Sequence, residues 1–296
     1  MYANSQPGLE EFLAAPVEEV AKVAPLTMIY SASGTRRHAA FAGIATQGDD
    51  YARWTRERMI ETIKVIFQHG VRHLFIIAAT PSQFNEITKN YREHVWRWLD
   101  WGLGGPEALA DYNRFEWRVR IVFTERLPRL QATAARLEAM TPSQSRHNLW
   151  FFVAPDCHFL WQCMVEAIQR AKEKTQDEVV RALYGESIPS ASLYLGTGKP
   201  GVSPDQLPPF LVRDQIIQCY WSQRPGYSLY KNQLRTIFYD YAYLRKTWRK
   251  DKTGRAEQAL AHREAWEQGP TIGAGMQLGP FWYPAPFSLP SLQTQE

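Results

Sequence analysis

Strand-like and helix-like segments alternate along most of this 296-residue chain, and the alternation constrains its fold more than any other feature. Short apolar stretches indicate strands at Leu26–Ser31, His73–Ala79, Trp117–Phe123, Asn148–Val153, Ala191–Leu195 and Ile216–Trp221. Stretches with helical apolar spacing indicate helices at Asp50–His69, Ser82–Trp101, Pro128–Met140, about His158–Lys174 and Asp177–Tyr184. This order predicts a single α/β domain, in which helices flank a mostly parallel central sheet of about six strands.

The α/β domain is expected to cover residues 25–230, after an N-terminal extension at residues 1–24. Residues 231–296 are expected to form a C-terminal helical extension that ends in an aromatic, Gly- and Pro-rich tail from Gly269. Its helices are predicted at Lys231–Arg249 and about Arg255–Trp266. We expect this part to pack on the same domain or on a dimer partner.

The composition narrows the class of protein. The formal charge is +4, from 34 basic and 30 acidic residues, which is too balanced to predict nucleic-acid binding but suits a small anionic substrate. The sequence contains no run of eighteen apolar residues, so we expect no membrane span. The N-terminus lacks the pattern of a signal peptide. The three cysteines (Cys157, Cys163 and Cys219) have no framework spacing, which favours a reducing compartment. We therefore expect a cytoplasmic protein.

The loop after the first strand, Ser33-Gly34-Thr35-Arg36-Arg37-His38, is the strongest candidate for a binding site. Gly34 allows close backbone approach, and Thr35 offers a hydroxyl group and an amide. Arg36 and Arg37 offer planar guanidinium groups, which suit bidentate phosphate recognition. Two adjacent arginines are often only a surface feature, but ligands of parallel sheets bind at the carboxyl ends of strands. The loop is therefore predicted to bind phosphate.

Two further segments could complete such a site. The loop after the fifth strand, Gly196-Thr197-Gly198-Lys199-Pro200-Gly201, is glycine-rich and carries one cation, although an ordinary turn explains it equally well. Asp49, Asp50 and Tyr51 stand where a helix is expected to begin. The aspartates could cap that helix, or they could contribute to Mg²⁺ binding or catalysis near the first loop.

Several other kinds of site are not supported. The loop after the fifth strand lacks the spacing of a phosphate-binding P-loop, and no dinucleotide fingerprint is present. The Asp156-Cys157-His158 segment offers too few ligands for structural zinc. No serine lies in a nucleophile-elbow pattern, so a Ser-His-Asp hydrolase is not predicted.

Three motifs resemble those of the cis-prenyltransferase superfamily, whose best-known members make undecaprenyl diphosphate. The family opens with Asp-Gly-Asn-Gly-Arg-Trp after the first strand, where this chain has Ser33–His38. Its Gly-Asp-Arg-Ser-Arg-Leu-Pro stretch is similar to Phe123–Pro128, and its late Arg-Thr-Gly-Gly-Glu-x-Arg-x-Ser motif is similar to Leu195–Ser203. The resemblance runs from about Leu26 to Trp221 and implies the cis-prenyltransferase fold.

Within that superfamily the chain resembles more closely the tuberculosinyl-adenosine transferases, which are also tuberculosinol synthases, and related terpene-alcohol synthases. These enzymes carry Asp-Gly-Thr-Arg-Arg at the first loop and an Asp-Asp-Tyr like Asp49–Tyr51 before the next helix. The similarity continues through Leu234–Arg245, Gly273–Gly275 and Phe281–Tyr283. It implies a homodimer and a preformed, often bicyclic, diterpenyl diphosphate as the substrate.

The chemistry of the loops and the resemblance together predict roles for residues of this chain. We expect the diphosphate to be bound by Gly34, Thr35, Arg36, Arg37, His38 and Lys199. We expect catalytic roles for Ser33, Asp49, Asp50 and Tyr51, with Asp49 and Asp50 as candidate Mg²⁺ ligands.

Two departures from the family pattern bear on which activity to expect: one on chain elongation, the other on Mg²⁺ binding and catalysis. In chain-elongating enzymes two arginines of the late motif bind the isopentenyl donor, but Leu195 and Gly201 occupy those positions here. Losing two such contacts costs roughly 1.5–3 kcal/mol each, so elongation is not expected. Ser33 replaces the opening aspartate that the family links to Mg²⁺ and catalysis, and a serine is a poor Mg²⁺ ligand. Either Asp49 or Asp50 supplies the carboxylate, or ionisation relies on Arg36, Arg37 and backbone amides, or the chain is not catalytic.

The expected function is therefore that of a terpene synthase or prenyl transferase that ionises an allylic diphosphate. The carbocation, shielded by aromatic faces with Tyr51 first among them, is then quenched by water or a small nucleophile, or loses a proton to give an alkene. The alternative is a non-catalytic scaffold subunit of a cis-prenyltransferase complex, which Ser33 would fit.

Overall fold

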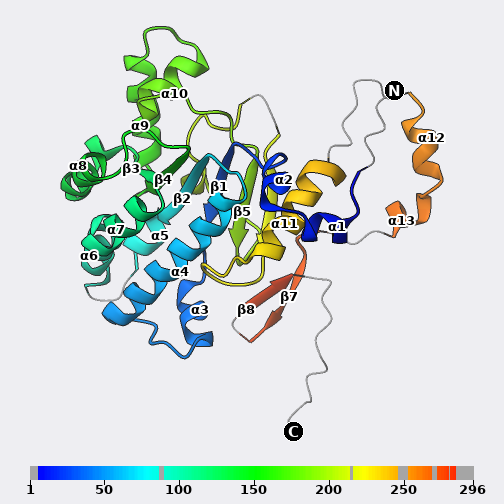
Figure 1. Ribbon diagram of the computed structural model, residues 1–296, viewed down its shortest axis with the longest axis horizontal. Helices are drawn as coiled ribbons and strands as arrows, with labels where there is room; N and C mark the ends of the chain where they lie inside the picture. Colours follow the sequence, from blue (N-terminus) through cyan, green and yellow to red (C-terminus); the bar gives the residue numbers. More distant parts are fainter. Residues whose placement is uncertain are drawn as a thin grey trace. The chain divides into compact units, whose positions relative to one another are not determined.

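A six-stranded parallel sheet forms the centre of the computed structural model, which describes residues 6–86, 90–213, 216–245, 253–268, 272–279 and 281–284 (Figure 1). The strands are β1 (Thr27–Ser31), β2 (His73–Ala79), β3 (Trp117–Ile121), β4 (His147–Val153), β5 (Leu193–Thr197) and β6 (Gln218–Ser222). Their spatial order is β3-β4-β2-β1-β5-β6, and every neighbouring pair is parallel. The predicted α/β class and six strands are confirmed.

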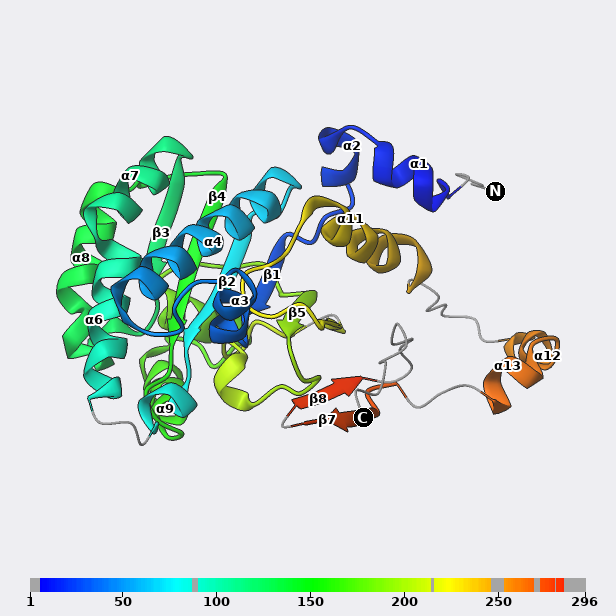
Figure 2. The ribbon, with the colours of Figure 1, turned by 90° about the horizontal axis from the view of Figure 1, so that it is seen from below.

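Helices cover both faces of the sheet, as parallel crossovers require. The helices of the domain are α3 (Thr35–Phe41), α4 (Gly48–Gln68), α5 (Pro81–Phe84), α6 (Tyr91–Gly104), α7 (Pro106–Arg114), α8 (Gln131–Met140), α9 (Phe159–Arg170) and α10 (Gln176–Tyr184). Figure 2 shows α4 and α7 on one side of the sheet and α9 on the other. Aromatic contacts agree, because Tyr112 of α7 packs on Phe151 whereas Tyr184 of α10 packs edgewise on Phe75 and Trp150.

The topology places β1 at the centre of the sheet, between β2 and β5. Met28 pairs with Leu74 on one side and with Leu193 on the other, and all five residues of β1 are buried. A strand buried on both faces and both edges needs a continuous apolar run, which Met28–Tyr30 supplies between the buried hydroxyl residues Thr27 and Ser31. The loops after β1 and β5 therefore leave the same edge of the sheet side by side.

Three predicted elements differ from the structure. Residues 35–38, expected to belong to a loop, form the first part of α3, and Gly34 caps this helix in the left-handed region with φ +80°. The helix predicted at Ser82–Trp101 is divided into α5 and α6, and residues 87–89 lie outside the described residues. The Gly104-Gly105-Pro106 break is followed by an unpredicted helix, α7, in which Pro106 occupies the first helical position.

The N-terminal extension forms two short helices, α1 (Leu9–Ala14) and α2 (Val17–Ala21), and α1 packs against α11 (Lys231–Tyr239). Arg235 of α11 is 1% exposed and donates hydrogen bonds to the carbonyl oxygens of Leu13 (2.7 Å) and Ala15 (2.6 Å). Its Nε donates to Nε2 of His69, which caps α4. One buried arginine therefore ties the extension to the domain.

The chain divides into two compact units, Met1–Tyr243 and Leu244–Glu296. The helix predicted to reach Arg249 ends at Tyr239 and continues as a π-helix at Asp240–Leu244, and residues 246–252 lie outside the described residues. The helix predicted at about Arg255–Trp266 is two helices, α12 (Arg255–Leu260) and α13 (Arg263–Glu267).

The tail contains an unpredicted antiparallel pair, β7 (Gly275–Leu278) and β8 (Phe281–Pro284). Residues 285–296 of the tail lie outside the described residues. The domain bounds at 25–230 and 231–296, and the packing of the second part, stay predictions. Among the helices that the structure describes, none combines the length and the apolar character needed to span a membrane.

Candidate active site

The first turn of α3 forms the centre of the candidate site. Gly34 adopts φ +80° and ψ +28°, and its carbonyl oxygen accepts the backbone N–H of His38 at 3.0 Å. This geometry places Thr35, Arg36 and Arg37 in the first helical turn, directly beyond the carboxyl end of β1. Backbone N–H groups at the start of a helix have no partner within the helix, so they are suited to contact an anion.

Two other strands hold this turn in place. The Thr197 hydroxyl at the end of β5 accepts the backbone N–H of Ser33 and donates to the Ser33 carbonyl oxygen, both at 2.7 Å. The Ser33 carbonyl oxygen also accepts the backbone N–H of Gly226 at 2.7 Å, from the loop after β6. Tyr30 in turn donates its buried hydroxyl to the Gly226 carbonyl oxygen at 3.0 Å. The loops after β1, β5 and β6 therefore converge at Ser33.

Arg37 folds back over the helix start. A β-carbon placed on Gly34 would lie 2.8 Å from Arg37 Nη2, and one placed on Gly198 would lie 3.6 Å from the same atom. The guanidinium group therefore lies between the two glycines that follow β1 and β5. We call the arrangement of Gly34, Thr35, Arg37, Thr197 and Gly198 the anion cradle. Lys199 follows it in the chain and is exposed.

Arg36 points to a different partner. It forms a bidentate ion pair with Glu86, with nitrogen–oxygen distances of 3.0–3.2 Å, and its guanidinium carbon lies 4.6 Å from the centre of the Tyr91 ring. The two adjacent arginines therefore separate: Arg37 lies in the anion cradle and Arg36 is held at an aromatic wall. A phosphate role for Arg36 stays a prediction.

The aromatic wall comes from α4 and α6. Tyr51 is 7% exposed, and its hydroxyl oxygen lies 2.6 Å from Oγ1 of Thr35. Its ring packs edgewise on Trp98 at 6.0 Å, and Trp98 packs in the same way on Tyr91. The electron-rich faces of such rings can stabilise a cation. The aromatic wall therefore contacts the cradle directly, through the hydrogen bond between Tyr51 and Thr35.

Histidine and tyrosine side chains around the cradle stay neutral. Burial, followed by the positive charges of Arg58 and Arg224, lowers the pKa of His38, whose ring packs edgewise on Trp54 at 4.7 Å. Burial raises the pKa of Tyr91 and Tyr227 above the ordinary value for tyrosine. The His38 imidazole and the Tyr91 and Tyr227 phenols therefore add no charge to this region at neutral pH.

The predicted carboxylates do not converge on the cradle. Asp49 and Asp50 lie in the first turn of α4, where they form ion pairs with Arg97 (2.9 Å) and Arg53 (3.6 Å) and their side chains are 74% and 86% exposed. No group of three or more His, Cys, Asp or Glu side chains suited to a metal occurs within the part of the chain that the structure describes. Since Ser33 is neutral, the described residues do not fit a protein-built Mg²⁺ site.

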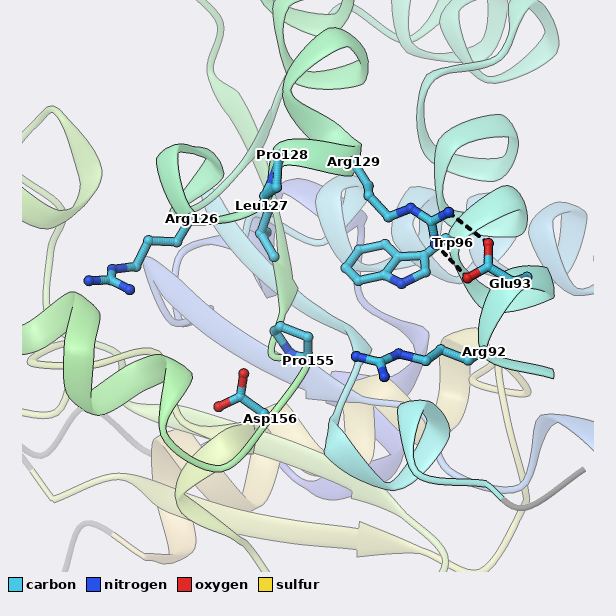
Figure 3. Close-up of a pocket in the computed structure, with 9 residues that line it drawn as sticks. All are labelled: Arg92, Glu93, Trp96, Arg126, Leu127, Pro128, Arg129, Pro155 and Asp156. Atoms are coloured by element: carbon cyan, nitrogen blue, oxygen red, sulfur yellow. Dashed lines mark hydrogen bonds and ion pairs between the residues drawn. The ribbon is translucent and has the colours of Figure 1, made fainter. Parts of the chain in front are cut away.

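A second pocket lies on the same edge of the sheet, beyond β3 and β4 (Figure 3). It has a volume of about 350 Å³ and contains the Phe123–Pro128 motif. Its lining residues are Arg92, Glu93, Trp96, Arg126, Leu127, Pro128, Arg129, Pro155 and Asp156. Arg129 is paired with Glu93, and Arg126 turns away from the pocket to pair with Glu166. This motif therefore belongs to a pocket distinct from the cradle.

Several residues of the site were not predicted from the sequence. Glu86, Tyr91 and Trp98 lie on a segment whose helical pattern is that of an ordinary surface helix. Gly226 follows Pro225 after the sixth strand, and a Pro-Gly pair is typical of a turn. This pair could have predicted a turn at the carboxyl edge of the sheet.

Two known proteins are similar in sequence to this chain over most of its length. The chain is 45% identical over 285 residues to (+)-kolavelool synthase of Herpetosiphon aurantiacus, covering 96% of this chain and 98% of that protein. It is 25% identical over 255 residues to tuberculosinyl adenosine transferase of Mycobacterium tuberculosis, covering 80% and 83% of the two chains. No protein-family model matches the chain.

Two solved structures share the fold at 15% sequence identity. Lavandulyl diphosphate synthase of Lavandula x intermedia, in complex with dimethylallyl diphosphate, superposes with a TM-score of 0.58 over 75% of this chain and 97% of that chain. A probable undecaprenyl diphosphate synthase of Campylobacter jejuni gives a TM-score of 0.54 over the same shares.

The parallel sheet, the glycine–arginine turn after β1 and these relatives together define a member of the cis-prenyltransferase superfamily. Within it, the chain belongs to the family of terpene synthases that includes (+)-kolavelool synthase. The fold and family that the motifs implied are confirmed.

Proposed function

We propose that this protein ionises a diterpenyl diphosphate and quenches the allylic carbocation with water, releasing a terpene alcohol and diphosphate. The observation that carries the proposal is the contact between the anion cradle and the aromatic wall, where Thr35 and Tyr51 lie 2.6 Å apart. An allylic diphosphate needs an anion site and a cation site separated by one C–O bond, and this junction supplies both. The two relatives found by sequence, a kolavelool synthase and a tuberculosinyl transferase, support diterpenyl substrates.

The cradle would bind the diphosphate through the Arg37 guanidinium group and the backbone N–H groups at the start of α3. These groups are fixed by the bonds of Thr197 and Gly226 to Ser33, so they need no rearrangement when charge develops on the leaving oxygen. Preorganised donors of this kind are usually the largest contribution to catalysis. We propose supporting contacts from Lys199 and His38.

The aromatic wall would hold the carbocation next to the departing diphosphate. Tyr51 presents a nearly buried ring to this junction, and Trp98 and Tyr91 extend the wall away from the cradle. When a water oxygen bonds to the cation, one water proton must leave. Tyr51 can accept it while passing its own proton through the Thr35 hydroxyl to a diphosphate oxygen, which balances the step.

Chain elongation is not part of the proposal. Leu195 is buried in β5 and Gly201 carries no side chain, so neither offers the cation that a second diphosphate would need. The scaffold alternative depended on Ser33 alone, and nothing in the structure or among the relatives favours it. The relative at 45% identity is named as an enzyme and matches along almost its whole length.

Mg²⁺ dependence remains a prediction of the resemblance, and no step is assigned to the metal because Asp49 and Asp50 do not meet at the cradle.

We also propose a homodimer in the cytoplasm. Three free cysteines, one of them exposed, support a reducing compartment. Light scattering of the purified chain would test the dimer.

The direct test is incubation of the protein with farnesyl, geranylgeranyl and bicyclic diterpenyl diphosphates, with and without Mg²⁺. We expect diphosphate release and a terpene alcohol from at least one diterpenyl substrate, identified by mass spectrometry. Absence of diphosphate release from all three substrates under both conditions would contradict the proposal.

A further inference from the structure

Several buried polar atoms on one helix layer make no hydrogen bond. Among the described residues, these include Oγ1 of Thr55 and Nε of Arg56 on α4, Nε1 of Trp98 on α6, and the hydroxyl of Tyr112 on α7. We call these four side chains the inner polar strip. Tyr112 is 0% exposed, so its hydroxyl cannot be satisfied by bulk solvent. Buried polar groups nearly always have a partner, which is often an ordered water molecule.

The strip adjoins the aromatic wall. Thr55 lies four residues after Tyr51, so both side chains share the face of α4 that turns toward the core. Trp98 contacts the Tyr51 ring directly. The buried Tyr227 interacts electrostatically with both Tyr51 and Tyr112, and burial raises the pKa of Tyr112 and of Tyr227. The strip thus continues inward from Tyr51.

Packing alone does not explain these groups. Arg56 has a structural role, because it pairs with Asp111 at 2.8 Å and joins α4 to α7, yet its Nε remains without a partner. Thr55 could donate to a carbonyl oxygen of its own helix, as buried helical threonines often do, but no such bond forms. Valine and phenylalanine would fill the positions of Thr55 and Tyr112 at lower cost if the site held only hydrocarbon.

Solvent reaches the outer side of the same helix pair. A groove of about 250 Å³ is lined by residues of α4 and α6, including Ala52, Trp98 and Trp101. Trp98 therefore has this groove on one side and Tyr51 on the other. Water is the ligand that suits unpartnered groups of this kind, since it can accept from an N–H such as Trp98 Nε1–H and donate to a hydroxyl oxygen such as that of Thr55 or Tyr112.

We propose that the inner polar strip holds the water that quenches the carbocation, and thereby sets the ratio of alcohol to alkene. This inference rests on the proposed function. The water oxygen forms the new C–O bond, and its proton leaves through Tyr51 and Thr35 to the diphosphate. Without a held water, the cation loses a proton from carbon to the diphosphate and an alkene forms.

The test compares Thr55→Val and Tyr112→Phe with the wild-type protein, using whichever of the three diphosphates the wild type converts, in water enriched in ¹⁸O. Both changes keep the side-chain shape and remove one hydroxyl group. We expect the alcohol-to-alkene ratio to fall by about tenfold, the factor that corresponds to one hydrogen bond of ordinary strength. Diphosphate release should fall by much less than the ratio.

Tyr184→Phe is the matched control, because it also removes a buried phenol hydroxyl, one that bonds to the Pro209 carbonyl oxygen on the other face of the sheet. Its product ratio should equal that of the wild type. An unchanged ratio in both strip variants, or an equal change in Tyr184→Phe, would overturn the inference while leaving ionisation intact. Incorporation of ¹⁸O into diphosphate instead of the alcohol would indicate P–O cleavage and overturn the proposed function itself.

Discussion

Two arginine-rich regions lie on the carboxyl edge of the same sheet, and they differ in how their charge is used. At the β3–β4 pocket, Arg129 forms an ion pair with Glu93 (Figure 3), and Arg126 forms one with Glu166. At the anion cradle, Arg37 lies against two glycines and the open start of a helix. The two regions therefore place the same residue type in different surroundings: carboxylate partners on helices at the pocket, and two glycines at the start of a helix at the cradle.

Arg36 shows the same contrast within a single helical turn. It follows the pattern of the β3–β4 pocket, with a bidentate glutamate partner, although it is adjacent to Arg37 in the chain. Guanidinium groups satisfied by carboxylates gain little from a phosphate, because the ligand must first displace the partner. Both regions contain arginines, so the number of arginines does not distinguish them. The cradle differs from the β3–β4 pocket in its glycines and in the backbone N–H groups at the start of a helix.

The largest effect is expected from Arg37→Ala. Loss of one or two charge-assisted hydrogen bonds at the leaving group should lower kcat/KM by about 10²–10³-fold. Arg126→Ala is the matched control at the β3–β4 pocket and should change kcat/KM by less than about twofold, the ordinary scale of a surface ion pair. Steady-state kinetics with the converted diphosphate measures both. Equal losses in the two variants would remove the distinction between the regions.

Gly34→Ala tests whether the cradle needs the clearance that glycine provides. The new β-carbon would lie 2.8 Å from Arg37 Nη2 and 3.0 Å from Pro225 Cβ. We expect about 10–100-fold lower kcat/KM and a loss of about 1–2 kcal/mol in the free energy of unfolding, since φ is positive.

Gly43→Ala provides the control for Gly34→Ala. Gly43 also has positive φ (+72°) but no side chain or backbone atom within 4 Å of an added β-carbon. It should lose similar stability and retain activity. If Gly43→Ala loses as much activity as Gly34→Ala, the clearance at the cradle is not the cause.

Thr197→Val should have a smaller effect, of about tenfold in kcat/KM. The change keeps the shape of the β5 end but removes the hydroxyl that holds the Ser33 backbone through two hydrogen bonds. Thr27→Val removes a comparable bond, to the Pro189 carbonyl oxygen, at the opposite end of β1. Thr27→Val should reduce thermal stability without reducing kcat/KM. If Thr27→Val lowers kcat/KM and Thr197→Val does not, Thr197 does not position the turn.

The smallest effect concerns pH at the β3–β4 pocket. Hydrogen bonds from Arg129 and Arg126 hold the pKa of Glu93 and Glu166 below the ordinary value for glutamate. The ion pairs therefore persist above the ordinary pKa and are lost only as pH falls through the lower folded values. Between pH 5 and pH 8, titration calorimetry with pyrophosphate should detect the cradle alone. A second site that appears within this range would contradict closed pairs at the pocket.

The sequence predicted the sheet well because β1, β2 and β4 are buried on both faces and need unbroken apolar runs. It also located the cradle, since a Gly-Thr-Arg-Arg turn directly after such a strand can lie only at the carboxyl edge. It could not show that Arg36 turns to Glu86, fifty residues further along the chain. Whether an arginine is paired depends on tertiary contacts that no local pattern records.

Several helix boundaries were predicted wrongly, and the structure shows the local reasons. Gly34 was interpreted as part of a loop, but a glycine with positive φ can also begin a helix. The helix that begins at Pro106 was not predicted, although proline is well accommodated in the first helical position. Asp49 and Asp50 were placed correctly at the start of α4, yet the exposure of their side chains and the pairing of Asp49 with Arg97 of α6 depend on tertiary structure.

The bond between Ser33 and Thr197 joins residues 164 positions apart, and the one between Tyr30 and Gly226 joins residues 196 positions apart. During synthesis, the first strand and its arginines leave the ribosome long before either partner exists. Contacts of such separation form late in folding and are costly to close. A nascent chain that ends before Gly226 therefore carries the turn after β1 without the two hydrogen-bonded supports that shape it.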